Sequence, residues 1–222
     1  MKKALRRIAL AFINRVRPPV DPLIEARRLA RWLAAGSPHP MPPIVKHAVL
    51  ERFAAEHGLR TLIETGTRRG DTLAALYGKF DALHSIELLP DVYETAHQRF
   101  RSSPKIHLYL GDSAVLLPQI IAELRQPALF WIDAHSPPGQ PRPGETVTPI
   151  LIELEHIFAA PFLGHVIIVD DAHLFMPDVC EQNGYPALSN VLTRIERDGR
   201  WDAKIELNSI RITPKAATVH KH

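Results

Sequence analysis

Short apolar runs alternate with amphipathic stretches along most of the chain after residue 43. They predict strands near 60–64, 82–87, 106–110, 128–132 and 165–169, and helices near 44–57, 71–78, 90–101, 113–124, 148–159 and 186–198. Such alternation is typical of βαβ units wound around a parallel sheet. The end differs, because 201–207 and 210–213 flank the turn-like pair Asn208-Ser209 and predict a closing antiparallel hairpin. The pattern therefore predicts an α/β protein with a doubly wound, mostly parallel sheet of seven strands.

The first 43 residues have a different pattern. Residues 3–16 alternate basic and apolar positions at roughly helical spacing, and a second helix is expected near 22–35, before the Pro-rich connector 37–43. We therefore expect a basic N-terminal helical extension over residues 1–43 and a main domain over residues 44–222. The first helix could lie on an anionic membrane or a partner, or it could be a solvated helix packed on its own domain.

Charge and composition narrow the class of protein. The formal net charge of +3 arises from an excess of Lys and Arg in the first 31 residues, so the remainder is slightly acidic, which argues against nucleic-acid binding. No apolar run approaches the ~20 residues of a membrane-spanning helix. Cys180 is the single cysteine, which suits a reducing compartment. We expect a cytoplasmic protein that the basic helix could attach peripherally to a membrane.

Polar residues close each predicted strand, where open α/β sheets bind ligands. The first strand leads into the run Glu64-Thr-Gly-Thr-Arg-Arg-Gly-Asp-Thr72. In this run Gly66 and Gly70 let the backbone turn tightly and approach a ligand at a helix start. The turn alone is a weak signal, but Glu87 closes the second strand, where an acidic side chain can accept hydrogen bonds from ribose hydroxyls. Together they indicate a nucleoside-containing cofactor.

The type of cofactor follows from a missing motif. The Gly-x-Gly-x-x-Gly run of dinucleotide sites is absent, and Thr67-Arg68 stands where its middle glycine would make room for a pyrophosphate. A cofactor without pyrophosphate fits better, and S-adenosylmethionine is such a molecule. Asp112 and Ser113, after the third strand, could contact its adenine edge, because a carboxylate can accept from an exocyclic amine.

Three carboxylates follow the fourth and fifth strands: Asp133, Asp170 and Asp171. Brought together without a cation, they would repel one another in a partly buried site. Hard oxygen ligands suit Mg²⁺, so the trio predicts a site for Mg²⁺ or another divalent cation. Alternatively, Asp171 caps the next segment and Asp170 accepts backbone hydrogen bonds.

Over residues 44–213 the order of these motifs resembles the class I S-adenosylmethionine-dependent methyltransferases. The run from Ile63 to Thr72 resembles the first motif of the catechol O-methyltransferase group. The resemblance implies a methionine end lined by Glu64, Gly66 and Thr72 beside Gly70, a ribose partner in Glu87, and an adenine site formed by Asp112, Ser113 and His135. The acidic trio resembles the metal site of that group and of the macrocin-type sugar O-methyltransferases.

The resemblance fails at the general base. Catechol-type enzymes place a Lys shortly after the fourth-strand Asp, whereas here Asp133 is followed by Ala-His-Ser-Pro-Pro138. His135 and His173 are the nearest candidates for a base beside Asp133, since a His takes a proton near neutral pH. For either His, an adenine contact or a loop hydrogen bond is an equally good interpretation. The Pro/Gly-rich loop 136–144 is either an active-site lid or a plain surface insertion.

We therefore predict methyl transfer from S-adenosylmethionine to a hydroxyl, with a sugar or small diol as the acceptor on the strength of the resemblance. Two other functions remain. The trio could activate water in a metal-dependent hydrolase, in which the turn containing Gly66 and Gly70, called the glycine turn below, holds a phosphate. Alternatively, the chain could be a non-catalytic module that docks through its basic helix. The sequence leaves the oligomeric state open.

Overall fold

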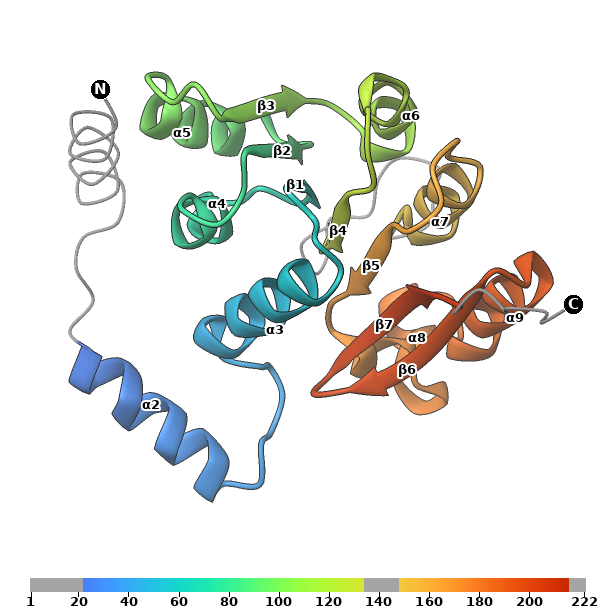
Figure 1. Cartoon of the computed structure of the whole chain (residues 1–222). Helices are drawn as coiled ribbons and strands as arrows, with labels where there is room; N and C mark the ends of the chain where they lie inside the picture. Colours follow the sequence, from blue (N-terminus) through green and yellow to red (C-terminus); the bar gives the residue numbers. More distant parts are fainter. Residues whose placement is uncertain (1–21, 134–147, 216–222) are drawn as a thin grey trace, which may run out of the picture.

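The computed structural model describes residues 22–133 and 148–215 (Figure 1). The first part contains α2 (Pro22–Ala34), α3 (Pro43–Glu56), β1 (Thr61–Thr65), α4 (Asp71–Leu76), β2 (Ala82–Glu87), α5 (Pro90–Phe100), β3 (Ile106–Leu110), α6 (Ser113–Glu123) and β4 (Leu129–Ile132). The second contains α7 (Ile150–Phe158), β5 (Val166–Val169), the 3₁₀ helix η1 (Ala172–Phe175), α8 (Pro177–Asn183), α9 (Leu188–Asp198), β6 (Trp201–Glu206) and β7 (Ser209–Pro214). The basic segment 3–16 and the loop 136–144 lie outside the described residues.

The strands form one seven-stranded sheet in the order β3-β2-β1-β4-β5-β7-β6. The first five are parallel, and β7 pairs antiparallel with both β5 and β6. The strand order reverses between β1 and β4, which is where doubly wound sheets bind ligands at the carboxyl ends of their strands. The predicted fold class, with its closing hairpin, is confirmed.

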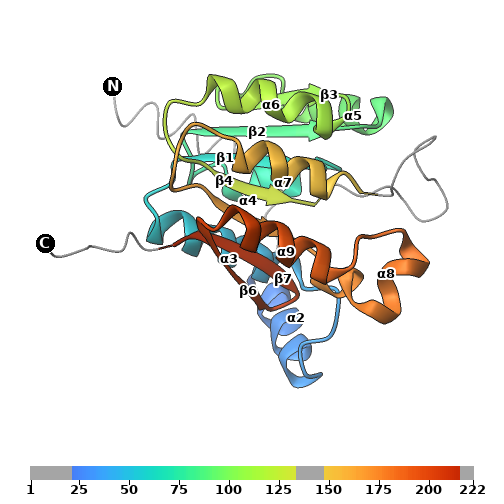
Figure 2. The ribbon, with the colours of Figure 1, turned by 90° about the vertical axis from the view of Figure 1, so that its right-hand side faces the viewer.

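Helices cover both faces of the sheet, with α3, α4 and α5 on one side and α6, α7 and α9 on the other (Figures 1 and 2). Neighbouring strand residues point to opposite faces, so Leu62 packs with the α3 side and Ile63 with the α6 side, both fully buried. This explains why the parallel strands read as continuous apolar runs rather than alternating ones. Each fully buried Leu or Ile stabilises the fold by roughly 1.5–3 kcal/mol.

The element bounds agree with the predicted ones to within two residues for all strands and most helices. The sequence pattern missed η1 and α8, which together cover 172–183 after the fifth strand. Both are short, and the first residue of α8 is Pro177, whose fixed φ suits the start of a helix. Two short turns of helix carry too little periodicity to be recognised in a sequence.

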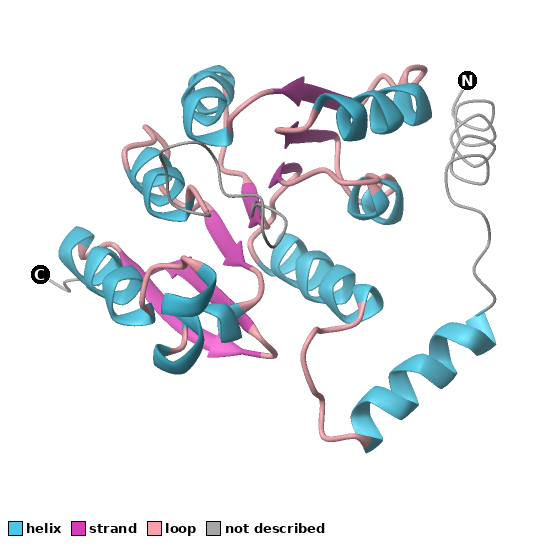
Figure 3. Cartoon of the chain, turned by 180° about the vertical axis from the view of Figure 1, so that it is seen from behind, coloured by secondary structure: helices cyan, strands magenta, loops and turns pink. Residues whose placement is uncertain are grey.

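The N-terminal helix α2 projects from the rest of the described chain (Figures 1 and 3). Its Leu23 and Leu33 side chains are 65% and 57% exposed. The connector that follows is tied to α2, because Trp32 Nε1 donates to the Pro38 carbonyl over 2.7 Å, and it reaches the core at the buried Met41. Among the described helices, none combines the length and the apolar character needed to cross a membrane.

Candidate active site at the carboxyl ends of the strands

The loop after β1 is tied to β2 by backbone hydrogen bonds. Gly66 N–H donates to the Ile86 carbonyl over 3.0 Å, and Thr67 N–H reaches the same oxygen over 3.3 Å. Gly66 has a φ of +93°, a conformation that favours glycine because it has no Cβ. The loop is therefore held against the end of β2, where Glu87 lies.

Glu64 is buried at the end of β1. Its Oε2 accepts from Ser85 Oγ over 2.6 Å, and the Thr72 hydroxyl also hydrogen-bonds to it. Because Ser85 gives its proton to Glu64, Thr67 Oγ1 is the donor in its own 2.6 Å contact with Ser85. Burial raises the pKa of Glu64 to about 7. Glu64 and Thr72, both predicted at the methionine end of the cofactor, thus lie together.

Glu87 closes β2 and is 7% exposed. Its Oε2 accepts from the backbone N–H of Arg68 over 2.9 Å, and its Oε1 accepts from that of Leu89 over 3.0 Å. These bonds fix the plane of the carboxylate beside the glycine turn. A carboxylate has about four lone-pair sites, so two remain for ribose hydroxyls.

Gly70, predicted in the cofactor turn, also has a packing role. It is the N-cap of α4 with φ +69°, and a Cβ added there would lie 2.3 Å from Cε2 of Phe100. The close approach of α4 to α5 therefore requires this glycine.

The third strand leads into the residues predicted to contact adenine. Asp112 is the N-cap of α6, and its Oδ1 accepts from Ala114 N–H over 2.9 Å. Ser113 is buried, and its Oγ has no hydrogen-bond partner among the described residues. An acceptor or donor brought by a ligand would satisfy this hydroxyl. His135, the third predicted adenine contact, lies outside the described residues.

The three predicted metal ligands converge. Ile132 and Val169 are register partners in neighbouring parallel strands, so Asp133 and Asp170 emerge side by side. One ligand oxygen from each of Asp133, Asp170 and Asp171 lies within 4.8 Å of the others. They line a pocket together with Thr148 and Tyr185.

The electrostatics of this cluster reflect crowded negative charge. Burial, followed by the charge of Asp170, raises the pKa of Asp133 well above its ordinary value. Burial also raises the pKa of Asp170, against the opposing effect of Lys46. Burial and then the nearby carboxylates raise the pKa of Tyr185, so its hydroxyl stays protonated and able to donate.

The donor set fits a hard divalent ion. Asp170 Oδ1 is buried and has no hydrogen-bond partner among the described residues, which is costly for a carboxylate oxygen. Asp171 occupies the N-cap position of η1, but its side chain makes no capping hydrogen bond. The interpretation of Asp171 as a simple cap is therefore wrong, whereas Asp170 does accept a hydrogen bond from the Asp171 backbone, as the alternative expected. Together, Asp133, Asp170 and Asp171 could hold Mg²⁺ or a similar ion through oxygen.

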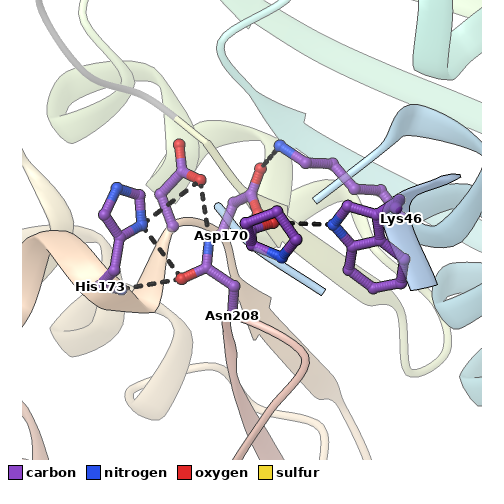
Figure 4. A network of polar contacts seen from close by, with 7 residues as sticks. Lys46, Asp170, His173 and Asn208 are labelled. Carbon is purple, nitrogen blue, oxygen red and sulfur yellow. Dashed lines mark hydrogen bonds and ion pairs between the residues drawn. The ribbon is translucent and has the colours of Figure 1, made fainter. Parts of the chain in front are cut away.

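Sequence reasoning missed the cation in this cluster. Lys46, on α3, forms an ion pair with Asp170 Oδ2, and Figure 4 shows the two side chains meeting. Lys46 shares a helix face with Val49 and Leu50, which are buried. A charged residue three and four positions before buried ones was the available signal that its side chain points inward.

On the other side of Asp170, Asn208 organises the site (Figure 4). Its Oδ1 accepts the backbone N–H of His173 over 2.9 Å and contacts His173 Nδ1 at 3.0 Å, while its Nδ2 donates to Asp171 Oδ1 over 3.2 Å. An oxygen facing Nδ1 requires the ring proton there, which leaves Nε2 as the basic nitrogen of a neutral imidazole. The His39 ring stacks on His173 with centroids 4.6 Å apart.

No protein-family model and no curated protein sequence matches the chain, whereas many solved structures do. An O-methyltransferase from Bacillus cereus in complex with S-adenosylhomocysteine has a TM-score of 0.59 at 18% identity, covering 92% of this chain and 96% of that one. The O-methyltransferase TomG from Streptomyces achromogenes, involved in tomaymycin synthesis and in complex with S-adenosylmethionine, has a TM-score of 0.58 at 16% identity (88% and 90% covered). The S-adenosylhomocysteine-bound methyltransferase PaMTH1 from Podospora anserina has a TM-score of 0.59 at 14% identity (96% of each chain). The chain therefore has the fold of the class I S-adenosylmethionine-dependent methyltransferases, as the sequence resemblance implied.

Proposed function

We propose that the chain is an S-adenosylmethionine-dependent O-methyltransferase that uses a divalent cation. The observation that carries the proposal is the sheet edge itself. It holds Glu64 and Glu87 beside the glycine turn, and the acidic trio lies at the ends of the next two strands. Solved neighbours with this fold bind S-adenosylmethionine or S-adenosylhomocysteine, which supports the cofactor.

Bound at this edge, S-adenosylmethionine would supply an electrophilic methyl group, and the divalent ion would supply the positive charge that lowers the pKa of an acceptor hydroxyl. Glu87 would hold the ribose through its two free lone-pair sites. Glu64 and Thr72 would face the methionine end, while Asp112 and Ser113 would face the adenine. The carboxylates of the trio would bind the ion.

His173 is our candidate for the base that takes the proton of the acceptor. Asn208 holds its Nδ1 proton in place, so a neutral His173 presents Nε2 as a proton acceptor. The Nδ1 atom lies 3.9 Å from Asp171 Oδ1, so the ring stands beside the proposed metal site. His135 stays an alternative by its place in the sequence.

A sugar hydroxyl or a small diol is the proposed acceptor. Asp133, Asp170 and Asp171 would hold the ion, and a hard cation of this type would favour an acceptor with neighbouring hydroxyl oxygens. Holding such an acceptor beside the cofactor would orient one hydroxyl for transfer, and orientation is a large part of the rate enhancement of a transfer reaction.

The test is a calorimetric titration with S-adenosylhomocysteine, followed by a screen of sugars and diols with labelled S-adenosylmethionine and Mg²⁺. We expect saturable binding and methyl ether products. No binding of S-adenosylhomocysteine, together with Mg²⁺-dependent phosphatase activity, would favour the hydrolase instead.

A further inference from the structure

Lys46 brings a positive charge into the acidic cluster from a distant part of the chain. Its side chain is 18% exposed and that of Asp170 is 1% exposed, so the pair is largely shielded from water. The contact joins opposite charges, because at neutral pH a Lys is ordinarily an ammonium and an Asp a carboxylate. Lys46 therefore carries a positive charge into the cluster of the three proposed metal ligands.

The position of the ammonium relative to Asp170 is specific. It contacts Oδ2, while Oδ1 of the same carboxylate is buried without a hydrogen-bond partner among the described residues. Lys46 Nζ also lies 5.8 Å from the centroid of the Trp131 ring, a favourable distance for a cation–π contact. An ammonium that leaves Asp170 thus has a second stabilising neighbour within the site.

We propose that Lys46 is a built-in cation that neutralises part of the acidic trio when no divalent ion is bound and competes with the ion for Asp170. The inference rests on the proposed function, because it takes the trio to be a metal site. It adds that a bound ion and the Lys46 ammonium compete for the same carboxylate.

The charges in the cluster predict how removing the Lys46 charge changes the affinity for a divalent ion. Without any cation, three carboxylates with ligand oxygens within 4.8 Å would push one another apart. Lys46 offsets part of this repulsion while no ion is bound. The same charge repels the arriving ion and occupies one ligand atom. Removing it should tighten metal binding on the order of tenfold to a hundredfold, for an effective dielectric between those of protein and water.

The opposite role predicts the opposite result. If Lys46 served only to position Asp170 for the ion, its loss would loosen the carboxylate and weaken metal binding. The sign of the change in metal affinity therefore separates competition from support, independently of any effect on turnover.

The experiment measures Mn²⁺ binding by electron paramagnetic resonance in the full chain and in three variants. Lys46→Met keeps the length of the side chain without its charge, and Lys46→Arg keeps the charge. Lys79→Met is the matched control, because Lys79 pairs with Glu51 and is 54% exposed. We expect Mn²⁺ to bind at least tenfold more tightly to Lys46→Met, while Lys46→Arg and Lys79→Met bind like the unaltered chain. Equal or weaker binding by Lys46→Met would overturn the inference.

Two further readouts keep the result interpretable. If Lys46→Met does not fold, the ζ-ammonium NMR signal of Lys46 in the unaltered chain should shift when Mg²⁺ saturates the site, and an unchanged signal contradicts competition. S-adenosylhomocysteine affinity is measured in parallel. If the unaltered chain and Lys46→Met both bind S-adenosylhomocysteine but neither binds Mn²⁺, the metal site and this inference fail while the methyltransferase proposal stands. Loss of S-adenosylhomocysteine binding in the unaltered chain contradicts the methyltransferase proposal itself.

Discussion

The carboxylates at the carboxyl ends of β1 and β2 have different neighbours from those at the ends of β4 and β5. We call the first group the cofactor half of the sheet edge and the second the cation half. At the end of β1, Glu64 accepts a hydrogen bond from a hydroxyl of the neighbouring strand β2, and at the end of β2, Glu87 accepts from backbone N–H groups of two loops. At the ends of β4 and β5, the carboxylates crowd together, and the side chain of Lys46 supplies a counter-charge. Neutral donors suit a site that must recognise ribose hydroxyls, whereas crowded charge suits a site for a cation. The difference fits the proposed function, in which one half binds the cofactor and the other a cation.

The largest expected effect is a loss of methyl-transfer activity when the cation half is altered. Asp170→Asn removes the charge of a proposed ligand and should lower Mg²⁺-stimulated methyl transfer by about a hundredfold or more, since metal charge stabilisation is worth several kcal/mol. Initial rates with and without chelator measure it, with Asp81→Asn as the control, because Asp81 is an exposed partner of Arg60. If turnover stayed undiminished in Asp170→Asn and in the presence of chelator, the metal requirement would be wrong and the protein would be a metal-free methyltransferase.

A smaller effect is expected at the cofactor half. Glu87→Ala should weaken S-adenosylhomocysteine binding by about 1.5–3 kcal/mol, because two ribose hydroxyls lose a charged acceptor. Glu87→Gln, which keeps one acceptor oxygen, should lie between. Calorimetry measures both, and Glu94→Ala on the exposed side of α5 is the control. If Glu87→Ala bound S-adenosylhomocysteine with unchanged affinity, Glu87 would not be the ribose partner.

A third prediction asks whether Gly70 is needed for the packing of α4 on α5 or for cofactor binding. Gly70→Ala forces a Cβ into the Phe100 ring and should lower the free energy of unfolding by about 1–3 kcal/mol. Gly58 also has a positive φ, of +65°, but a Cβ there meets nothing within 4 Å, so Gly58→Ala reports the backbone strain alone. Denaturant unfolding should show the larger loss for Gly70→Ala, with the affinity for S-adenosylhomocysteine little changed. Equal losses would mean that Phe100 moves aside.

The smallest expected effect is the release of a fraction of a proton from Glu64 when S-adenosylhomocysteine binds. With a pKa of about 7 in the folded chain against an ordinary value of 4.5, Glu64 favours the folded state in its protonated form. Its contribution to stability is therefore lost as the pH rises from 4.5 through 7. An ammonium group of the cofactor near Glu64 should lower its pKa, so S-adenosylhomocysteine should release about half a proton at pH 7. Calorimetry in buffers of different ionisation enthalpy measures this release, and Glu64→Gln should abolish it. Proton uptake would contradict the placement.

The sequence predicted the features that depend on neighbouring strands. Asp133 and Asp170 each follow an apolar run, and parallel pairing alone brings such residues together. It could not predict Lys46, which lies 124 residues from Asp170 and reaches it from another layer. Asn208 was predicted only as a turn residue, although its side chain fixes His173 and Asp171. The contact between Gly70 and Phe100 could not be predicted either, because it depends on how α4 packs on α5.

The central claim is that one edge of the sheet contains two separable sites. A pair of titrations tests it most directly: S-adenosylhomocysteine by calorimetry and Mn²⁺ by electron paramagnetic resonance, each on Glu87→Ala and Asp170→Asn. The account predicts that Glu87→Ala loses affinity for S-adenosylhomocysteine and keeps its Mn²⁺ affinity, whereas Asp170→Asn loses Mn²⁺ and keeps S-adenosylhomocysteine. If either substitution weakened both ligands equally, or if the unaltered chain bound neither, the division of the sheet edge into a cofactor half and a cation half would be wrong.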